Sequence, residues 1–215
     1  MSISTRSSAS DLRSSSPAVR WFWLIFALTT VFQVIRLMQD SAGSWLAVDY
    51  AMRLAALGLL ALSPVRAAVF CREPRRVTVP RLIVCMLATG AAIVLMVVVE
   101  RKLWSILPDM SLGQYPRTTG WLYLVDLTFG IALVAIHEEL VFRRLARLAF
   151  SRLGDGLAMI AATSLLFALY HWWTGPLNVL MVALAGILLM LLYRAVGALW
   201  PAMVVHYCVD FYVFV

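Results

Sequence analysis

The 215-residue sequence predicts an all-α fold, a polytopic membrane helix bundle. Hydrophobic residues make up 63% of the chain and charged residues only 13%, which is far from the composition of a soluble domain. The apolar residues form segments long enough to cross a bilayer, and basic residues gather in the short loops between them. We therefore interpret the net charge of +7 as a topology signal and predict no nucleic-acid partner.

The chain is predicted to start with a disordered cytoplasmic tail over residues 1–20. This segment is rich in serine and nearly free of large apolar side chains, so it cannot bury enough surface to offset the entropy lost on ordering. N-terminal membrane helices follow over residues 21–118, and a second membrane domain covers residues 119–215. We predict about seven transmembrane helices, at residues 21–38, 45–65, 82–99, 121–153, 157–172, 177–193 and 199–215.

The first three predicted spans carry few signals beyond their hydropathy. The first is rich in aromatic residues and lacks a small-x-small cleavage site, so we interpret it as a membrane span and not as a secretory signal. The second carries Asp49 and Arg53, which lie four residues apart on one helical face and are interpreted as a structural ion pair. A loop rich in arginine and proline leads to the third span, which has an uninterrupted apolar sequence.

The remaining four spans are joined by short connections that contain glycine. The "LGDG" turn separates the fourth span from the fifth, and "WTGP" and "RAVG" separate the last three. With the N-terminus inside, most of the 18 basic residues fall on the cytoplasmic side, so the orientation is predicted to be N-in and C-out. His137 is interpreted as a group that caps a helix or extends toward the membrane interface among arginine side chains. Three arginines are interpreted as solvated or phospholipid-facing charges: Arg144, Arg147 and Arg152.

Two adjacent carboxylates, Glu138 and Glu139, stand out in the apolar fourth span. An acidic residue at the centre of a membrane helix costs roughly 2.5–3.5 kcal/mol on insertion scales, so each carboxylate needs a partner or a function. The other histidines of the chain, His171 and His206, also lie in apolar segments. These intramembrane polar residues are the first candidates for a functional site.

Counting residues from the turn between the fourth and fifth spans gives the depth of each side chain. Glu138 lies 16 residues before Gly154, and His171 lies 16 residues after Asp155. At a rise of 1.5 Å per residue both are roughly 24 Å from the turn, so antiparallel helices hold them at one level. His206, on the seventh span, matches this depth more loosely.

The spacing within each helix indicates which residues share a face. Glu139 and Arg143 are four residues apart, which predicts a buried ion pair, and Glu138 is turned about 100° away, toward His171. Two further pairs have the same spacing, Phe167 with His171 and His206 with Asp210. Two carboxylates in two environments are a recurring arrangement in acid–base catalysis.

These residues fall in three short motifs, "EELVFR", "FALYH" and "HYCVD". In this order they resemble the EExxxR, FxxxH and HxxxN/D motifs of the CPBP family, which contains CAAX-type (type II) prenyl endopeptidases and bacteriocin-processing intramembrane proteases. The resemblance covers the chain from about residue 119 onward, whereas the first three spans match only as generic hydrophobic helices.

The resemblance implies an intramembrane endopeptidase in the plasma (inner) membrane that cleaves a membrane-anchored protein or peptide. It implies that Glu138 and His171 activate a water molecule, and that His206 and Asp210 face the oxyanion. An ionised Asp210 cannot donate a hydrogen bond, so it must be protonated or must orient His206. Glu139, Arg143 and Phe167 are expected to support these groups.

Three alternatives stay open at the level of sequence. "HEELV" is not an H-E-x-x-H site, so we favour a mechanism without metal or cofactor, but zinc held by Glu138, His171 and His206 remains an alternative. In the zinc alternative, the enzyme is a protease of a sorting or peptide-export system. The third alternative is a non-catalytic membrane scaffold for immunity or transport, although we find no inverted repeat of broken helices in the sequence.

Overall fold

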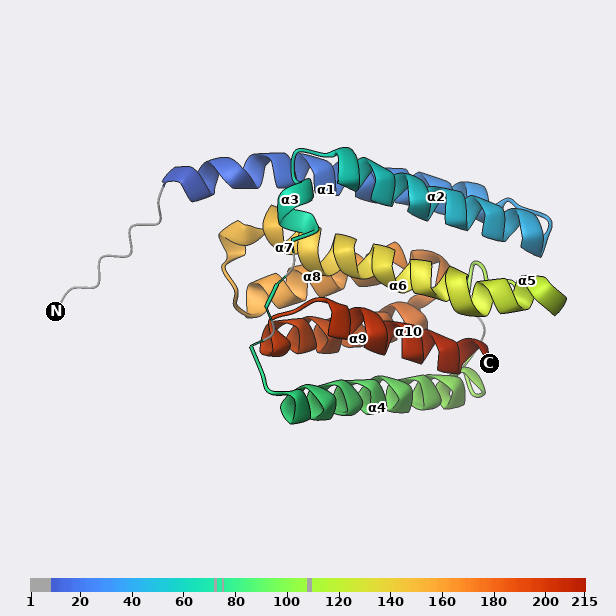
Figure 1. Ribbon diagram of the computed structural model, residues 1–215. Helices are drawn as coiled ribbons and strands as arrows, with labels where there is room; N and C mark the ends of the chain where they lie inside the picture. Colours follow the sequence, from blue (N-terminus) through green and yellow to red (C-terminus); the bar gives the residue numbers. More distant parts are fainter. Residues whose placement is uncertain (1–8, 72, 75, 108–109) are drawn as a thin grey trace.

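The computed structural model describes residues 9–71, 73–74, 76–107 and 110–215, and within these ranges it contains helices and no strand. The all-α prediction is confirmed. The helices α1 and α2 lie on one side of the bundle, α4 lies on the opposite side, and the C-terminal helices lie between them (Figure 1). In chain order, the helices are α1 (Ala9–Leu37), α2 (Ala42–Leu62), α3 (Arg66–Val69), α4 (Val79–Trp104), α5 (Gly120–Val125), η1 (Asp126–Gly130), α6 (Ile131–Glu139), η2 (Leu140–Leu145), α7 (Ala146–Ala149), η3 (Ser151–Leu153), α8 (Leu157–Tyr170), η4 (Trp172–Thr174), α9 (Pro176–Val196) and α10 (Trp200–Phe214).

Five helical segments of the described chain are long and apolar enough to cross a membrane, which confirms a multi-pass membrane protein. The helices α8 and α10 have 14 and 15 residues. At 1.5 Å per residue they extend about 21–23 Å, which is less than the roughly 30 Å of a hydrocarbon core. The count of about seven spans and the N-in orientation therefore stay predictions. The five segments are Pro17–Leu37, Ala42–Leu62, Val79–Trp104, Gly120–Ala149 and Pro176–Val196.

The predicted disordered tail falls partly outside the described residues. Residues 1–8 are not described, whereas α1 begins at Ala9, so the structure has a helix where the sequence predicts disorder for residues 9–20. The physical reason is that the following apolar segment already supplies a helical nucleus. Extending an existing helix adds one hydrogen bond for each residue fixed, whereas a separate polar segment must first form a nucleus.

The predicted fourth span is one helix, Gly120–Ala149, with two π-helical segments in it. The π-helical segments η1 and η2 lie directly before and after α6. They were not predicted, because periodicity in sequence does not distinguish a π turn from an α turn. The helix also ends at Ala149, before the predicted end near Leu153, since a short 3₁₀ turn and Gly154 with φ of 68° reverse the chain there.

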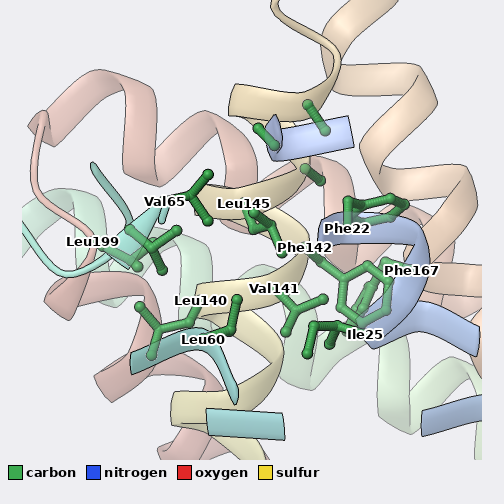
Figure 2. Close-up of a cluster of buried hydrophobic side chains, with 14 of the residues drawn as sticks. Phe22, Ile25, Leu60, Val65, Leu140, Val141, Phe142, Leu145, Phe167 and Leu199 are labelled. Atoms are coloured by element: carbon green, nitrogen blue, oxygen red, sulfur yellow. The ribbon is translucent and has the colours of Figure 1, made fainter. Parts of the chain in front are cut away.

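The larger buried core joins the N-terminal helices to η2 and α8. Phe142 of η2 lies at its centre, with its ring centroid 6.4 Å from that of Phe22 and 5.3 Å from that of Phe167 (Figure 2). Ile25 of α1 and Leu60 of α2 belong to the same cluster and are fully buried. A second buried cluster packs α4 against α9 and α10, so the C-terminal helices are covered on two sides.

Arg144 is buried and does not face solvent or phospholipid, so that interpretation of its charge was wrong. Its guanidinium group donates to the carbonyl oxygens of Ala68 at 2.9 Å and Cys71 at 3.0 Å, and to the Tyr193 hydroxyl at 2.8 Å. It also forms an ion pair with Glu73. Arg144 thereby connects η2 to the segment around α3 and to α9. The two carbonyl groups that it binds lie more than 70 residues from it in sequence, so the sequence pattern around Arg144 does not indicate them.

The close packing of α8 on α9 predicts a specific effect of adding one methyl group at Gly186. A Cβ atom there lies 3.2 Å from side-chain atoms of Phe167 and Ser164, so Gly186→Ala is expected to lower the free energy of unfolding by about 1–3 kcal/mol. At Gly58 of α2 a Cβ atom meets nothing within 4 Å, and Gly58→Ala should leave stability unchanged or raise it by about 0.5–1 kcal/mol. Thermal unfolding in detergent compares the two variants, and equal melting temperatures contradict the packing argument.

Candidate functional site

A chain of buried ion pairs leads from the N-terminal helices to Glu138. Arg36 of α1 pairs with Asp49 of α2, and the other carboxylate oxygen of Asp49 accepts from Arg53 Nε at 2.8 Å. Arg53 Nη1 donates to Glu138 Oε1 at 2.9 Å. None of these side chains is more than 4% exposed. The predicted pair of Asp49 and Arg53 is confirmed, and it extends to the first candidate residue of the site.

The second carboxylate oxygen of Glu138 faces two histidines. Glu138 Oε2 lies 3.8 Å from His171 Nε2 and 3.8 Å from His206 Nε2. The facing of Glu138 and His171 that the depth count predicts is present in the structure. Both separations are longer than a hydrogen bond, so a small polar group between these atoms is needed to connect them.

The orientation of His171 is set by the end of α8. Its Nδ1 atom lies 2.8 Å from the carbonyl oxygen of Phe167. Because a carbonyl only accepts, Nδ1 carries the hydrogen, and in the neutral ring Nε2 keeps its lone pair. Gln33 of α1 donates from Nε2 to the carbonyl oxygen of Tyr170 at 2.9 Å, so one unpaired carbonyl at the end of α8 is satisfied by another helix.

Glu139 connects α6 to α10 and to η2. Its Oε1 atom lies 3.0 Å from His206 Nδ1, and its Oε2 atom lies 3.3 Å from Arg143 Nε. The Arg143 guanidinium is fully buried and lies 4.4 Å from the ring centroid of Phe167. The structure thus brings together the three residues that the sequence predicts as supporting groups: Glu139, Arg143 and Phe167.

Asp210 lies one helical turn beyond His206 on α10. Its Oδ2 atom is 3.5 Å from His206 Nε2, so His206 has carboxylates within 4 Å on several sides. The connected ion-pair network of described residues holds four carboxylates and three guanidinium groups, so it carries one more acid than arginine. Its members are Asp49, Glu138, Glu139, Asp210, Arg36, Arg53 and Arg143.

Part of this network lines a cavity of about 380 Å³. The volume falls in the range of about 300–1,000 Å³ that is usual for ligand sites. Glu138, His171, His206 and Asp210 all contribute to its wall, and apolar side chains of α4 and α9 line it as well. The apolar lining residues include Ile93, Val97, Val182, Ala185 and Leu189. An extended, largely apolar ligand therefore fits beside the polar groups.

The predicted zinc alternative depends on Glu138, His171 and His206. Zinc bonds of 2.0–2.1 Å in a tetrahedral site place the ligand atoms about 3.3–3.4 Å apart. Glu138 Oε2 is 3.8 Å from each histidine Nε2, which is wider than that spacing. In the part of the chain that the structure describes, no group of three or more histidine, cysteine, aspartate or glutamate side chains is arranged to hold a metal ion. The prediction of a metal-free site, with zinc as its alternative, stays a prediction.

Arg53 is the main site residue that the sequence analysis missed. It was assigned only to Asp49, but its guanidinium also contacts Glu138 and lies 3.2 Å from His137 Nδ1. His137 lies beside an arginine but is fully buried, so the expectation that it caps a helix or extends toward the interface was wrong. The sequence contained a signal for this contact. The first two predicted spans hold two arginines, Arg36 and Arg53, but only one acidic residue, Asp49, so one arginine needs an acidic partner from another span.

Comparison with known proteins gives one family match. The family model described as type II CAAX prenyl endopeptidase Rce1-like matches residues 120–212. This range begins at the first residue of α5 and ends within α10, so it contains Glu138, His171, His206 and Asp210. The resemblance that the three motifs indicate from about residue 119 onward is confirmed. No curated protein and no solved structure matches the chain.

The buried ion-pair chain predicts a large effect of neutralising Asp49. Asp49→Asn leaves the guanidinium groups of Arg36 and Arg53 buried with too little negative charge, so the free energy of unfolding should fall by about 3–5 kcal/mol. The matched control is Asp155→Asn, which removes an exposed pair with Arg147 and should cost about 0–1 kcal/mol. Both are measured by thermal unfolding in detergent, and a shift at Asp49 no larger than at Asp155 contradicts the prediction.

Proposed function

We propose that the chain is an intramembrane protease of the type II CAAX prenyl endopeptidase Rce1-like kind, as the family match over residues 120–212 supports, and that it cleaves a membrane-anchored protein or peptide by a metal-free glutamate mechanism. In general terms, the family makes it a CAAX-type intramembrane protease, and its helices make it a multi-pass membrane protein. The mechanism, the substrate and a location in the plasma (inner) membrane are parts of the proposal.

The observation that carries the mechanism is the position of Glu138 Oε2, 3.8 Å from the Nε2 atoms of His171 and His206. Arg53 occupies Oε1, so Oε2 is the oxygen that faces the two histidines, which also line the cavity. A water molecule between Glu138 Oε2 and His171 Nε2 donates one hydrogen to each acceptor. Its oxygen lone pair then points away from both and toward a substrate carbonyl.

The proposed reaction is the hydrolysis of a peptide bond. The water oxygen attacks the carbonyl carbon while Glu138 takes the proton, and the carbonyl oxygen becomes an oxyanion. The carbon–nitrogen bond then breaks, and Glu138 returns the proton to the leaving amine. The products are a carboxylic acid and an amine, and Glu138 is ionised again.

His206 is proposed to stabilise the oxyanion through Nε2–H. Its Nδ1–H donates to Glu139, so donation from Nε2 requires a doubly protonated ring. The surplus of one carboxylate in the ion-pair network supports this form, because a positive His206 makes the buried network neutral and avoids a buried net charge. Asp210, beside Nε2, then orients the ring and need not donate to the oxyanion.

The first test is cleavage of a fluorescent peptide with a farnesylated C-terminal Cys-Ala-Ala-Met sequence by the purified protein in lipid nanodiscs. Glu138→Gln should lower the rate per folded molecule by at least about 100-fold, since the proton acceptor is lost. It also removes a charge partner of the buried Arg53, so the melting temperature should fall as well. Asp155→Asn, at the exposed turn, serves as the control and should retain activity.

The same assay with a zinc chelator separates the alternatives. Cleavage that survives chelation supports the glutamate mechanism. Loss of cleavage with chelator and its recovery with zinc would assign Glu138, His171 and His206 as ligands, as expected for a zinc protease of a sorting or peptide-export system. Failure to cleave both the farnesylated peptide and its unmodified counterpart would favour a non-catalytic scaffold for immunity or transport.

Alanine substitutions of His171 and Glu139 should have different effects, the first on cleavage and the second on stability. His171→Ala removes a water acceptor at the partly exposed end of α8, so cleavage should fall at least about 100-fold with little change in melting temperature. Glu139→Ala leaves the buried Arg143 charge without its carboxylate, so the free energy of unfolding should fall by about 3–5 kcal/mol. Rates per folded molecule and melting temperatures distinguish the two, and an unchanged melting temperature for Glu139→Ala contradicts the supporting role.

A further inference from the structure

A second group of polar side chains lies on the cavity wall beside His171. Gln33 and Arg36 come from α1, Tyr170 ends α8, and Trp173 lies in η4. All four line the cavity that contains Glu138. We refer to these four residues as the Gln33 cluster. Of its members only Tyr170 lies in one of the three motifs, at a variable position of "FALYH", and the two from α1 lie outside the matched residues 120–212.

Each member of the Gln33 cluster has a buried polar atom that lacks a hydrogen-bond partner within the described part of the chain. These atoms are Gln33 Oε1, Arg36 Nε, Tyr170 Oη and Trp173 Nε1. The side chains are at most 5% exposed. A buried polar atom without a partner costs about 1–3 kcal/mol, and such atoms are rare in folded proteins. Four of them belong to residues that line one cavity, and a ligand with matching polar groups can satisfy them once these side chains adjust to it.

The members of the cluster are held in place by one another. Gln33 Nε2 donates to the Tyr170 carbonyl oxygen at 2.9 Å, which leaves Gln33 Oε1 as the unused atom of that amide. The Arg36 guanidinium lies 4.6 Å from the ring centroid of Trp173. His171 lies between Tyr170 and Trp173 in the chain, so the cluster adjoins the pair formed by Glu138 and His171.

The unpaired atoms define the chemistry of the ligand. Arg36 Nε, Tyr170 Oη and Trp173 Nε1 offer hydrogens, whereas Gln33 Oε1 only accepts. Peptide main chain matches this set, because its carbonyl oxygens accept and its N–H groups donate. The phosphodiester of a lipid headgroup or an ionised lipid carboxylate offers no donor to Gln33, and the charge of Arg36 is already balanced by Asp49.

We propose that the Gln33 cluster is a subsite that binds the main chain of the substrate next to the scissile bond. The proposal rests on the proposed function, because it assumes a peptide substrate in this cavity. The N-terminal helix α1 then contributes to substrate binding, and specificity is not confined to the matched residues 120–212. The chemical class of ligand is an extended peptide segment of a membrane-anchored chain.

Tyr170→Phe is the most direct test, since it removes only the hydroxyl group. Binding of the farnesylated peptide is measured by fluorescence polarisation on the Glu138→Gln protein, which binds without cleaving. Adding Tyr170→Phe should weaken binding about 5-fold, as expected for one lost hydrogen bond of about 1 kcal/mol. The melting temperature of the free protein should stay the same or rise, because the hydroxyl has no partner there.

Tyr193→Phe is the matched control for the loss of a buried tyrosine hydroxyl. The Tyr193 hydroxyl accepts from Arg144 at 2.8 Å and does not line this cavity. Its removal should lower the melting temperature and leave peptide affinity unchanged. Peptide analogues with one amide N–H replaced by an ester oxygen test Gln33. One of them should bind about 5-fold more weakly, and this difference should disappear when Gln33→Leu is added.

The outcomes separate the subsite from the proposed function. Unchanged affinity in Tyr170→Phe together with cleavage by the wild type overturns the subsite and leaves the protease function intact. Weaker binding in Tyr170→Phe without cleavage by the wild type overturns the protease function and supports a peptide-binding site. No binding of either the farnesylated or the unmodified peptide overturns both.

Discussion

The ion pair between Arg53 and Glu138 is the interaction on which the site depends. A charge in the apolar interior is tolerated only where another charge and hydrogen bonds compensate it, so α2 must lie against α6 in the one rotation that joins these side chains. The same contact occupies Glu138 Oε1 and leaves Oε2 to face His171 and His206. The constraint that holds the helices together therefore also orients the carboxylate, and Asp49 and Arg36 extend it to α1.

This arrangement explains how helices outside the matched region take part in the site. The helices α1 and α2 cover one side of the C-terminal helices, and α4 covers the other (Figure 1). The cavity lies between the two covers, so its wall combines polar groups of α1, α6, α8 and α10 with apolar groups of α4 and α9. The C-terminal helices hold the paired carboxylates and histidines, whereas the N-terminal helices α1, α2 and α4 contribute part of the cavity wall.

Hydropathy and helical spacing predict a large share of this protein because both are local properties. The long apolar runs predict a membrane helix bundle, and a constant rise per residue places Glu138 and His171 at one depth without knowledge of other contacts. The same rules fail where distant partners decide the outcome. The neighbouring arginines predict that Arg144 is solvated. In the structure it is buried and donates to carbonyl oxygens of the α3 segment and to the Tyr193 hydroxyl.

The sequence by itself determined the fold class, the three motifs and the pairs of residues that share a helical face, since these follow from hydropathy and from positions within one helix. Only the tertiary structure decided which oxygen of Glu138 faces the two histidines, which arginine holds Glu138, and which polar atoms of α1 meet α8. The physical reason is that the spacing of residues sets a position along a helix. The rotation and contacts of that helix depend on packing against neighbours, and no stretch of sequence encodes that packing alone.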